Sequence, residues 1–186
     1  MGYILGIDEV GRGAWAGPLV LGAVILGESR IRGLKDSKLL PPEARRKLSE
    51  RIYKRCVFAS LGWVTSNELD EIGLTAATTL GIRRALSGFD FRGSEMIIDG
   101  SINYFKEYDG ARCIIKADRS VPAVSAAGII AKVARDDYMK KLAVKFPAYG
   151  FDSHVGYGTK VHRLNIEKHG ACPEHRSSFK PLAVYV

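Results

Sequence analysis

The chain has 186 residues, a formal net charge of +8 and a hydrophobic fraction of 46%, a composition that suits one globular domain with a full core. No apolar run reaches the roughly 18 residues of a membrane-spanning helix, and the N-terminus lacks the basic lead of a signal peptide. Its three cysteines are widely spaced, which favours reduced thiols, so we expect a cytoplasmic protein without membrane contact.

Hydrophobic patterning predicts an alternation of strands and helices. In chain order, it predicts strands over 3–8 and 18–26, a helix beginning near Pro42, a strand over 57–64, a short helix with a Thr65–Glu68 capping box, a helix over 74–86, strands over 95–99 and 112–116, a helix from 122 to about 146, a glycine-rich loop over 149–159 and a helix over 159–169. Small residues early in the 122–146 helix should permit close packing.

These elements predict an α/β domain with a central mixed five-stranded sheet flanked by helices. The connection between the first two strands has no room for a helix, so they should form an antiparallel hairpin. The later strands are separated by helices, which suits parallel crossovers.

Charge is unevenly distributed along the chain. Residues 30–55 carry ten Lys and Arg against three acids, and residues 140–180 carry eight against three, which leaves ten basic and fourteen acidic residues elsewhere. Any one of these charges alone would suggest a solvated helix face. Two basic flanks around an acidic centre predict a polyanionic partner, most simply a nucleic acid.

Carboxylates follow the apolar strands. Asp8, Asp99 and Asp118 each come at or just past the end of a strand, and Glu9 adjoins Asp8. The carboxyl ends of parallel strands meet at one edge of a sheet, so these groups should converge there. Four carboxylates with oxygen-only donors predict Mg²⁺ or Mn²⁺, and a two-ion site would suit phosphodiester hydrolysis. The alternative is that each aspartate only caps a turn.

The segment after the first carboxylates is rich in glycine. Gly11, Arg12, Gly13 and Gly17 do not fit the dinucleotide fingerprint, because the spacing is one residue too long and a strand follows. The glycines either let the backbone approach a ligand or form a tight hairpin turn. A second candidate motif, CPEH at 172–175, has no partner cluster nearby in sequence, so we do not expect a zinc site.

Six short motifs occur in one order along the chain: DEVGRG at 8–13, DSK at 36–38, KAD at 116–118, SAAGIIAKVARD at 125–136, GYGT at 156–159 and HRSSF at 175–179. In that order they closely resemble type 2 ribonuclease H, ribonuclease HII, over residues 3 to about 182. The resemblance implies an RNase H-like fold, with a catalytic domain over 1–146 and a small C-terminal loop and helical extension over 147–186 that contributes to substrate binding.

The resemblance also implies an activity. It implies metal-dependent endonucleolytic hydrolysis of RNA in RNA–DNA hybrids, and incision 5′ to single ribonucleotides in duplex DNA, leaving 3′-hydroxyl and 5′-phosphate ends. Two divalent ions, Mg²⁺ or Mn²⁺, are expected with substrate, and the protein is expected to be a monomer. The family's catalytic, metal-binding residues fall on Asp8, Glu9, Asp99 and Asp118. Its substrate-binding residues fall on Gly11, Arg12, Gly13 and Tyr157, with Lys38 of the DSK motif as a phosphate contact.

The chain departs from the family pattern at two places. Ala14-Trp15 stands where proline and leucine are common, and His154-Val155 stands where Asn-Lys is common. Both changes bear on substrate affinity and leave the carboxylates intact. Asp136 recurs in the motif, but four residues after Lys132 on a helix it is expected to form an i,i+4 pair.

Other functions remain to be weighed against the hydrolase. A non-catalytic nucleic-acid binder would have no use for a complete carboxylate set. Type 3 ribonuclease H typically has an additional N-terminal domain and lacks the GRG loop, whereas the first core strand here begins at residue 3. A metal-dependent phosphatase is a more remote alternative.

Overall fold

The computed structural model describes residues 2–34, 40–182 and 184. Its helices and strands, in chain order, are β1 (Ile4–Val10), β2 (Leu19–Ile25), α1 (Pro42–Arg55), β3 (Phe58–Val64), α2 (Ser66–Ala85), β4 (Glu95–Asp99), β5 (Ala111–Ile114), the 3-10 turn η2 (Ala117–Arg119), α3 (Pro122–Lys145), α4 (Phe151–His154) and α5 (Lys160–His169). No helix within the described ranges is long and apolar enough to cross a bilayer.

The five strands form one sheet in the order β3-β2-β1-β4-β5. β1 pairs antiparallel with β2, and β2 pairs antiparallel with β3. β4 runs parallel to both β1 and β5. The predicted mixed five-stranded sheet, with its hairpin and its parallel crossovers, is therefore confirmed.

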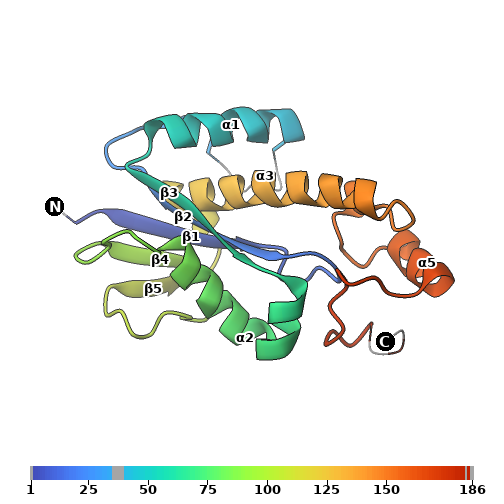
Figure 1. Cartoon of the computed structure of the whole chain (residues 1–186). Coiled ribbons are helices and arrows are strands. Elements are labelled where there is room, and N and C mark those ends of the chain that lie inside the picture. Colours follow the sequence, from blue (N-terminus) through green and yellow to red (C-terminus); the bar gives the residue numbers. More distant parts are fainter. Residues whose placement is uncertain (1, 35–39, 183, 185–186) are drawn as a thin grey trace.

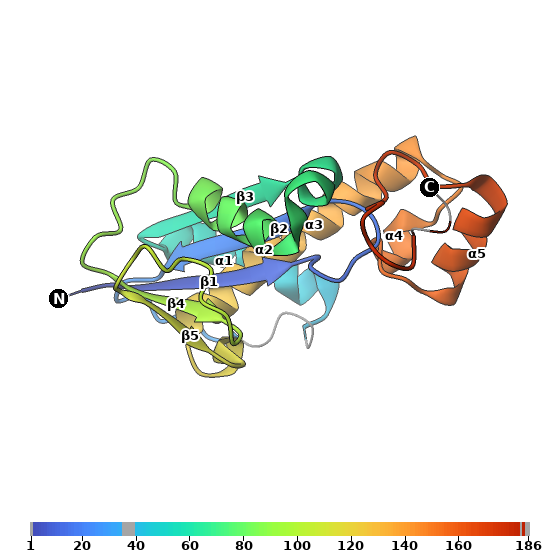
Figure 2. The same ribbon diagram turned by 90° about the horizontal axis from the view of Figure 1, so that it is seen from below.

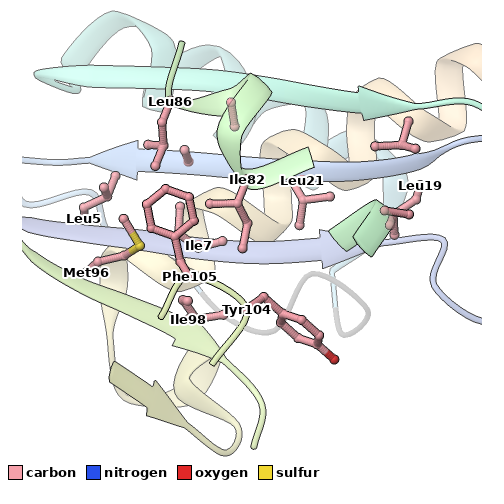
Figure 3. Packing of buried hydrophobic residues seen from close by; sticks show 14 of the residues in the cluster. Leu5, Ile7, Leu19, Leu21, Ile82, Leu86, Met96, Ile98, Tyr104 and Phe105 are labelled. Atoms are coloured by element: carbon pink, nitrogen blue, oxygen red, sulfur yellow. The ribbon is translucent and has the colours of Figure 1, made fainter. Parts of the chain in front are cut away.

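Helices cover both faces of this sheet (Figure 1). α2 packs on one face against β2 and β3, and α3 packs on the other against β1 and β2, with α1 outside α3. The larger core lies on the α2 face, where Leu5, Ile7 and Leu21 of the strands meet Ile82 of α2 (Figure 3). Burying aliphatic side chains of this size contributes roughly 1.5–3 kcal/mol each.

α3 approaches the sheet closely because glycines face it. A Cβ on Gly6 would collide with the backbone of Ala123, and one on Gly22 would collide with the backbone of Ala127. Small residues on both sides thus bring the helix backbone onto the strands. This agrees with the close packing that the sequence predicts for the start of the helix.

Two local predictions, the end of the first strand and the 149–159 loop, differ from the structure. The first strand continues through Asp8 to Val10, because β2 pairs with it as far as Val10, whereas pairing with β4 ends at Ile7. The two helical segments expected on either side of Gly73 are confirmed, since α2 comprises both of them, separated by a kink where Gly73 takes the non-helical φ of 76°. The loop over 149–159 contains the short helix α4, which opens at Gly150 in the left-handed region. The Thr65–Glu68 capping box is confirmed.

The C-terminal elements lie beyond the end of the sheet toward which β1 points (Figure 2). There α4 packs on α3. Phe151 and Ile166 are fully buried in a separate cluster that includes Met139 of α3. Residues far apart in sequence are thereby brought to the carboxyl end of β1.

Candidate active site

An open pocket of ≈ 520 Å³ lies where β1 and β4 end. Eight of the nine residues that the sequence nominates line it: Asp8, Glu9, Gly11, Arg12, Gly13, Asp99, Asp118 and Tyr157. The ninth, Lys38, lies outside the described residues. Lys132 and Val10 complete the lining. A single pocket therefore unites the carboxylates of three chain segments with the glycine loop and the distant tyrosine.

Asp8 lies in the interface between β1 and α3. Its Oδ1 accepts a hydrogen bond from the backbone N–H of Glu9 at 2.8 Å. Its carboxylate lies so close to Gly128 of α3 that a Cβ there would collide with it. Burial raises the pKa of Asp8 well above its ordinary value, and the charges of Glu9 and Asp99 raise it further. The site thus concentrates negative charge that a cation would relieve.

Asp99 and Asp118 are linked through the backbone. Asp99, the last residue of β4, accepts a hydrogen bond at Oδ1 from the N–H of Ala117 at 2.7 Å. Ala117 begins η2, the single turn that carries Asp118. Lys116, just before this turn, takes the left-handed conformation with φ 59°. A sharp reversal after β5, fixed by Asp99, therefore places Asp118 at the pocket.

The two glycines of the loop differ in what surrounds them. Gly11 has φ 92°, and a Cβ on it would collide with the side chain of Arg135. Gly13 is exposed, is outside the positive-φ set, and a Cβ on it would meet nothing within 4 Å. The packing of the protein thus requires glycine at position 11 and leaves position 13 open toward the pocket.

Arg12 is held beside the carboxylates from three sides. Its Nη1 lies 4.0 Å from Glu9 Oε1 and donates to Thr78 Oγ1 at 3.3 Å. Its guanidinium lies over the Tyr104 ring, 5.3 Å from the centroid. The side chain is about one-third exposed. It is therefore an oriented positive charge at the rim, suited to a phosphate.

Tyr157 reaches the pocket from the segment between α4 and α5. Its side chain is partly exposed, and its backbone carbonyl accepts a hydrogen bond from Nδ1 of the buried His162 at 3.0 Å. Preceding Gly156, at φ 84°, lies so close to the Ala16 carbonyl that a Cβ would collide with it. The tyrosine is thus fixed against the glycine loop through its backbone, and its ring remains available.

Lys132 lines the pocket, although its sequence position predicts only a pair with Asp136. The expected i,i+4 pair is confirmed, since its Nζ lies 2.6 Å from Asp136 Oδ1. The same side chain lines the pocket with the carboxylates. The sequence spacing could have indicated this position, because Lys132 follows Gly128 by one helical turn and so shares the helix face that meets Asp8.

The donor set fits a divalent cation. Four carboxylates from β1, β4 and η2 line the pocket and could supply the oxygen ligands that Mg²⁺ and Mn²⁺ prefer. No group of three or more His, Cys, Asp or Glu side chains among the described residues already has an arrangement that could hold a metal ion. The four carboxylates nevertheless line the same pocket.

A model of the family described as Ribonuclease HII matches residues 5–182. The chain belongs to the ribonuclease HII family. It is an RNase H endonuclease, a hydrolase of phosphodiester bonds. Ribonuclease HII of Paracidovorax citrulli (strain AAC00-1) is 43% identical over 187 residues, covering 100% of this chain and 77% of the relative. Ribonuclease HII of Shewanella halifaxensis (strain HAW-EB4) is 42% identical over 184 residues, covering 98% and 90%.

Solved structures agree with this family and fold. The ribonuclease H2 of Pyrococcus horikoshii OT3 matches with a TM-score of 0.84 at 27% identity, covering 98% of this chain and 96% of that one. Bst-RNase HIII, solved in complex with Mn²⁺, matches with a TM-score of 0.71 at 21% identity, covering 98% and 68%. The second likeness reflects the shared RNase H-like fold alone, so the type 3 alternative gains no support from it.

Proposed function

We propose that this ribonuclease HII cuts RNA in RNA–DNA hybrids and incises duplex DNA 5′ to single ribonucleotides, leaving 3′-hydroxyl and 5′-phosphate ends. The observation that carries the proposal is the shared pocket of the four carboxylates, the Gly11–Gly13 loop and Tyr157. Carboxylates can serve hydrolysis of any phosphodiester. The loop and the tyrosine are what would restrict it to ribose-containing substrates.

Asp8, Glu9, Asp99 and Asp118 would hold two divalent ions, Mg²⁺ or Mn²⁺. When bound, such ions activate a water molecule and stabilise the leaving oxygen of a phosphodiester. The raised pKa of Asp8 supports this assignment, because the cause is burial together with the charges of its three partners. The protein's own part is to fix these oxygens at the ends of β1, β4 and η2.

The loop would contact the 2′-hydroxyl, and Tyr157 would contact the next sugar. The open space at Gly13 lets a ribose approach the backbone, and Arg12 beside Glu9 can hold the neighbouring phosphate. The ring of Tyr157 would pack against a deoxyribose and be crowded by a further hydroxyl. Together they would recognise an RNA-to-DNA step and so position the scissile bond.

The two parts of the chain would divide this work. Residues 1–146 would form the catalytic domain, and residues 147–186 would add substrate contacts through Tyr157 and through exposed basic side chains of α5. Those side chains are Lys160, Arg163 and Lys168. Lys38 would contact a phosphate from its own segment. We further propose that the protein acts as a cytoplasmic monomer.

Replacing Asp99 with Asn tests the proposed site. The exchange removes a charged oxygen and keeps the shape and the acceptor for Ala117, so the fold should survive with an unchanged or higher midpoint of unfolding in EDTA. Incision of a duplex with one ribonucleotide, in Mg²⁺ or Mn²⁺, should fall by roughly two or more orders of magnitude. Near-normal turnover would reject the site. If the wild-type protein itself binds this duplex but does not incise it, the result would instead indicate a non-catalytic binder.

A further inference from the structure

Two arginines far apart in sequence lie buried behind the glycine loop. Arg135 of α3 and Arg176 near the C-terminus both have 0% exposure. Burial lowers the pKa of Arg176 to about 9, with the charge of Arg135 as the next cause, and burial also lowers the pKa of Arg135. Two like charges held away from water must be offset by well-placed acceptors.

Backbone carbonyl oxygens of the loop supply those acceptors to Arg135. Its Nε donates to the carbonyl of Pro18 at 2.9 Å, and its Nη2 donates to that of Ala16 at 3.0 Å. The third donor, Nη1, reaches the carbonyl of Val155 at 2.8 Å, in the segment that leads to Tyr157. One planar guanidinium therefore fixes the spacing between the two segments.

Arg176 holds the same loop from a second direction. Its Nε and Nη2 both donate to the carbonyl of Gly17, at 3.0 and 2.8 Å. Its Nη1 donates to the carbonyl of Arg12 at 3.1 Å. Its own N–H donates to the carbonyl of Trp15 at 2.8 Å. Arg12, whose positive charge lies at the rim of the pocket, is thus anchored through its backbone carbonyl.

Val155 carries strain that these contacts hold in place. It has φ 44°, in the left-handed region, which a β-branched side chain rarely adopts. Its N–H donates to the carbonyl of Phe151, while its own carbonyl points to Arg135. The Arg135 guanidinium also lies 5.7 Å from the centroid of the Tyr157 ring. The turn before the tyrosine is therefore set by Arg135.

We propose that Arg135 and Arg176 are positioning residues that hold the Gly11–Pro18 loop and Tyr157 at a fixed separation, and thereby set the preference for an RNA-to-DNA step. The inference rests on the proposed function, in which the loop and the tyrosine read that step. Lysine cannot replace either arginine here, because one ammonium lacks the planar fork that spans several carbonyls.

The test compares two substrates in Arg135→Lys and Arg176→Lys. For each variant, kcat/KM is measured on a duplex with one ribonucleotide and on a long RNA–DNA hybrid, with Mn²⁺ binding followed by calorimetry. The ratio of kcat/KM on the single-ribonucleotide duplex to kcat/KM on the long hybrid should fall at least tenfold. Mn²⁺ binding should be unchanged. The control is Arg84→Lys, outside both basic flanks, whose guanidinium donates to the carbonyl of Trp63 and to Glu68 away from the pocket. Its ratio should equal that of the wild type.

A readout on the loop itself separates positioning from general damage. With Trp63→Phe as background, Trp15 is the one tryptophan of the chain, and its fluorescence anisotropy should drop in Arg176→Lys. If either lysine variant fails to fold, Arg135→Gln and Arg176→Gln, which keep an amide donor but lose the planar fork, replace the lysine variants and should lower the ratio of kcat/KM on the single-ribonucleotide duplex to that on the hybrid at least tenfold. A ratio within twofold of the wild type, or an equal fall on both substrates, overturns the inference. Failure of the wild type to incise the single-ribonucleotide duplex overturns the proposed function instead.

Discussion

Gly11 and Gly13 are both glycine, but the physical reason differs between the two positions. Gly11 combines a positive φ with direct contact to Arg135, so its lack of a Cβ is required by the fold. Gly13 meets neither condition. A glycine that the protein's own packing does not require, at the edge of a carboxylate pocket, points to close approach by a ligand.

Gly13→Val should separate binding from folding. The added side chain enters open space, so the free energy of unfolding should change by no more than about 0.5 kcal/mol. It would displace the ribose from the backbone, and a misplacement of this size costs on the order of 10²-fold in kcat/KM. Incision assays with Mn²⁺ binding as control check this. Gly11→Val should instead destabilise the protein strongly, and the reverse pattern would refute the assignment.

Tyr157→Ala should change substrate preference more than activity as a whole. The ring is 37% exposed, so its loss should leave stability nearly unchanged. Cleavage of a single-ribonucleotide duplex should fall at least about tenfold more than cleavage of a long hybrid, since only the junction offers a deoxyribose to the ring. Tyr53→Ala, at a 48% exposed tyrosine on α1, is the control. Unchanged rates on the single-ribonucleotide substrate would show that the junction is read elsewhere.

Three buried histidines connect α4, α5 and the C-terminal segment. The N–H of Cys172 donates to His175 Nδ1 at 2.9 Å, which leaves the proton on Nε2 for His162 Nε2 at 3.1 Å. His162 then donates from Nδ1 to the carbonyl of Tyr157. This pattern requires neutral rings. His175 of the CPEH motif therefore serves turn geometry, and the Cys172 side chain packs against the cluster of Phe151 and Ile166.

This cluster predicts a pH-dependent stability. Burial lowers the pKa of His162 from 6.5 to about 4, so the unfolded state binds the proton first as the pH falls. The part of the free energy of unfolding that depends on neutral His162 is complete above pH 6.5 and is lost toward pH 4. The loss amounts to about 2 kcal/mol after allowance for solvent screening. Urea unfolding between pH 7 and 4.5 should show a shallower decline for His162→Gln. His169→Gln, at an exposed position, should decline as the wild type does.

Charge acts over the molecule as a whole. The net charge of +8 is concentrated in two flanks, and binding through them should release counterions from the nucleic acid. The logarithm of affinity should therefore fall with the logarithm of salt concentration with a slope of several units, and Lys38→Ala should reduce that slope by about one. Lys106→Ala, outside both flanks, should leave it unchanged. Affinity independent of salt would remove the electrostatic argument.

Residue order alone was sufficient to predict most of the architecture. The strands, the hairpin, the parallel crossovers and the Thr65–Glu68 capping box follow from periodicity and local chemistry, which act within a few residues. The convergence of Asp8, Asp99 and Asp118 also followed, because strand ends in a parallel arrangement meet at one edge. The strand boundary at Asp8 did not, since β1 continues to Val10 only because β2 pairs with it there, beyond the last residue that pairs with β4.

Contacts between distant segments decided the rest. Nothing local marks Arg135 and Arg176 as buried, because their acceptors are carbonyl oxygens of segments more than a hundred residues away or across a turn. The strained Val155 and the helix α4 likewise depend on α3 for support, and Phe151 of α4 shares a buried cluster with Ile166 of α5. Backbone acceptors have no side-chain signature in a sequence, so only the folded chain reveals which ones a buried charge requires.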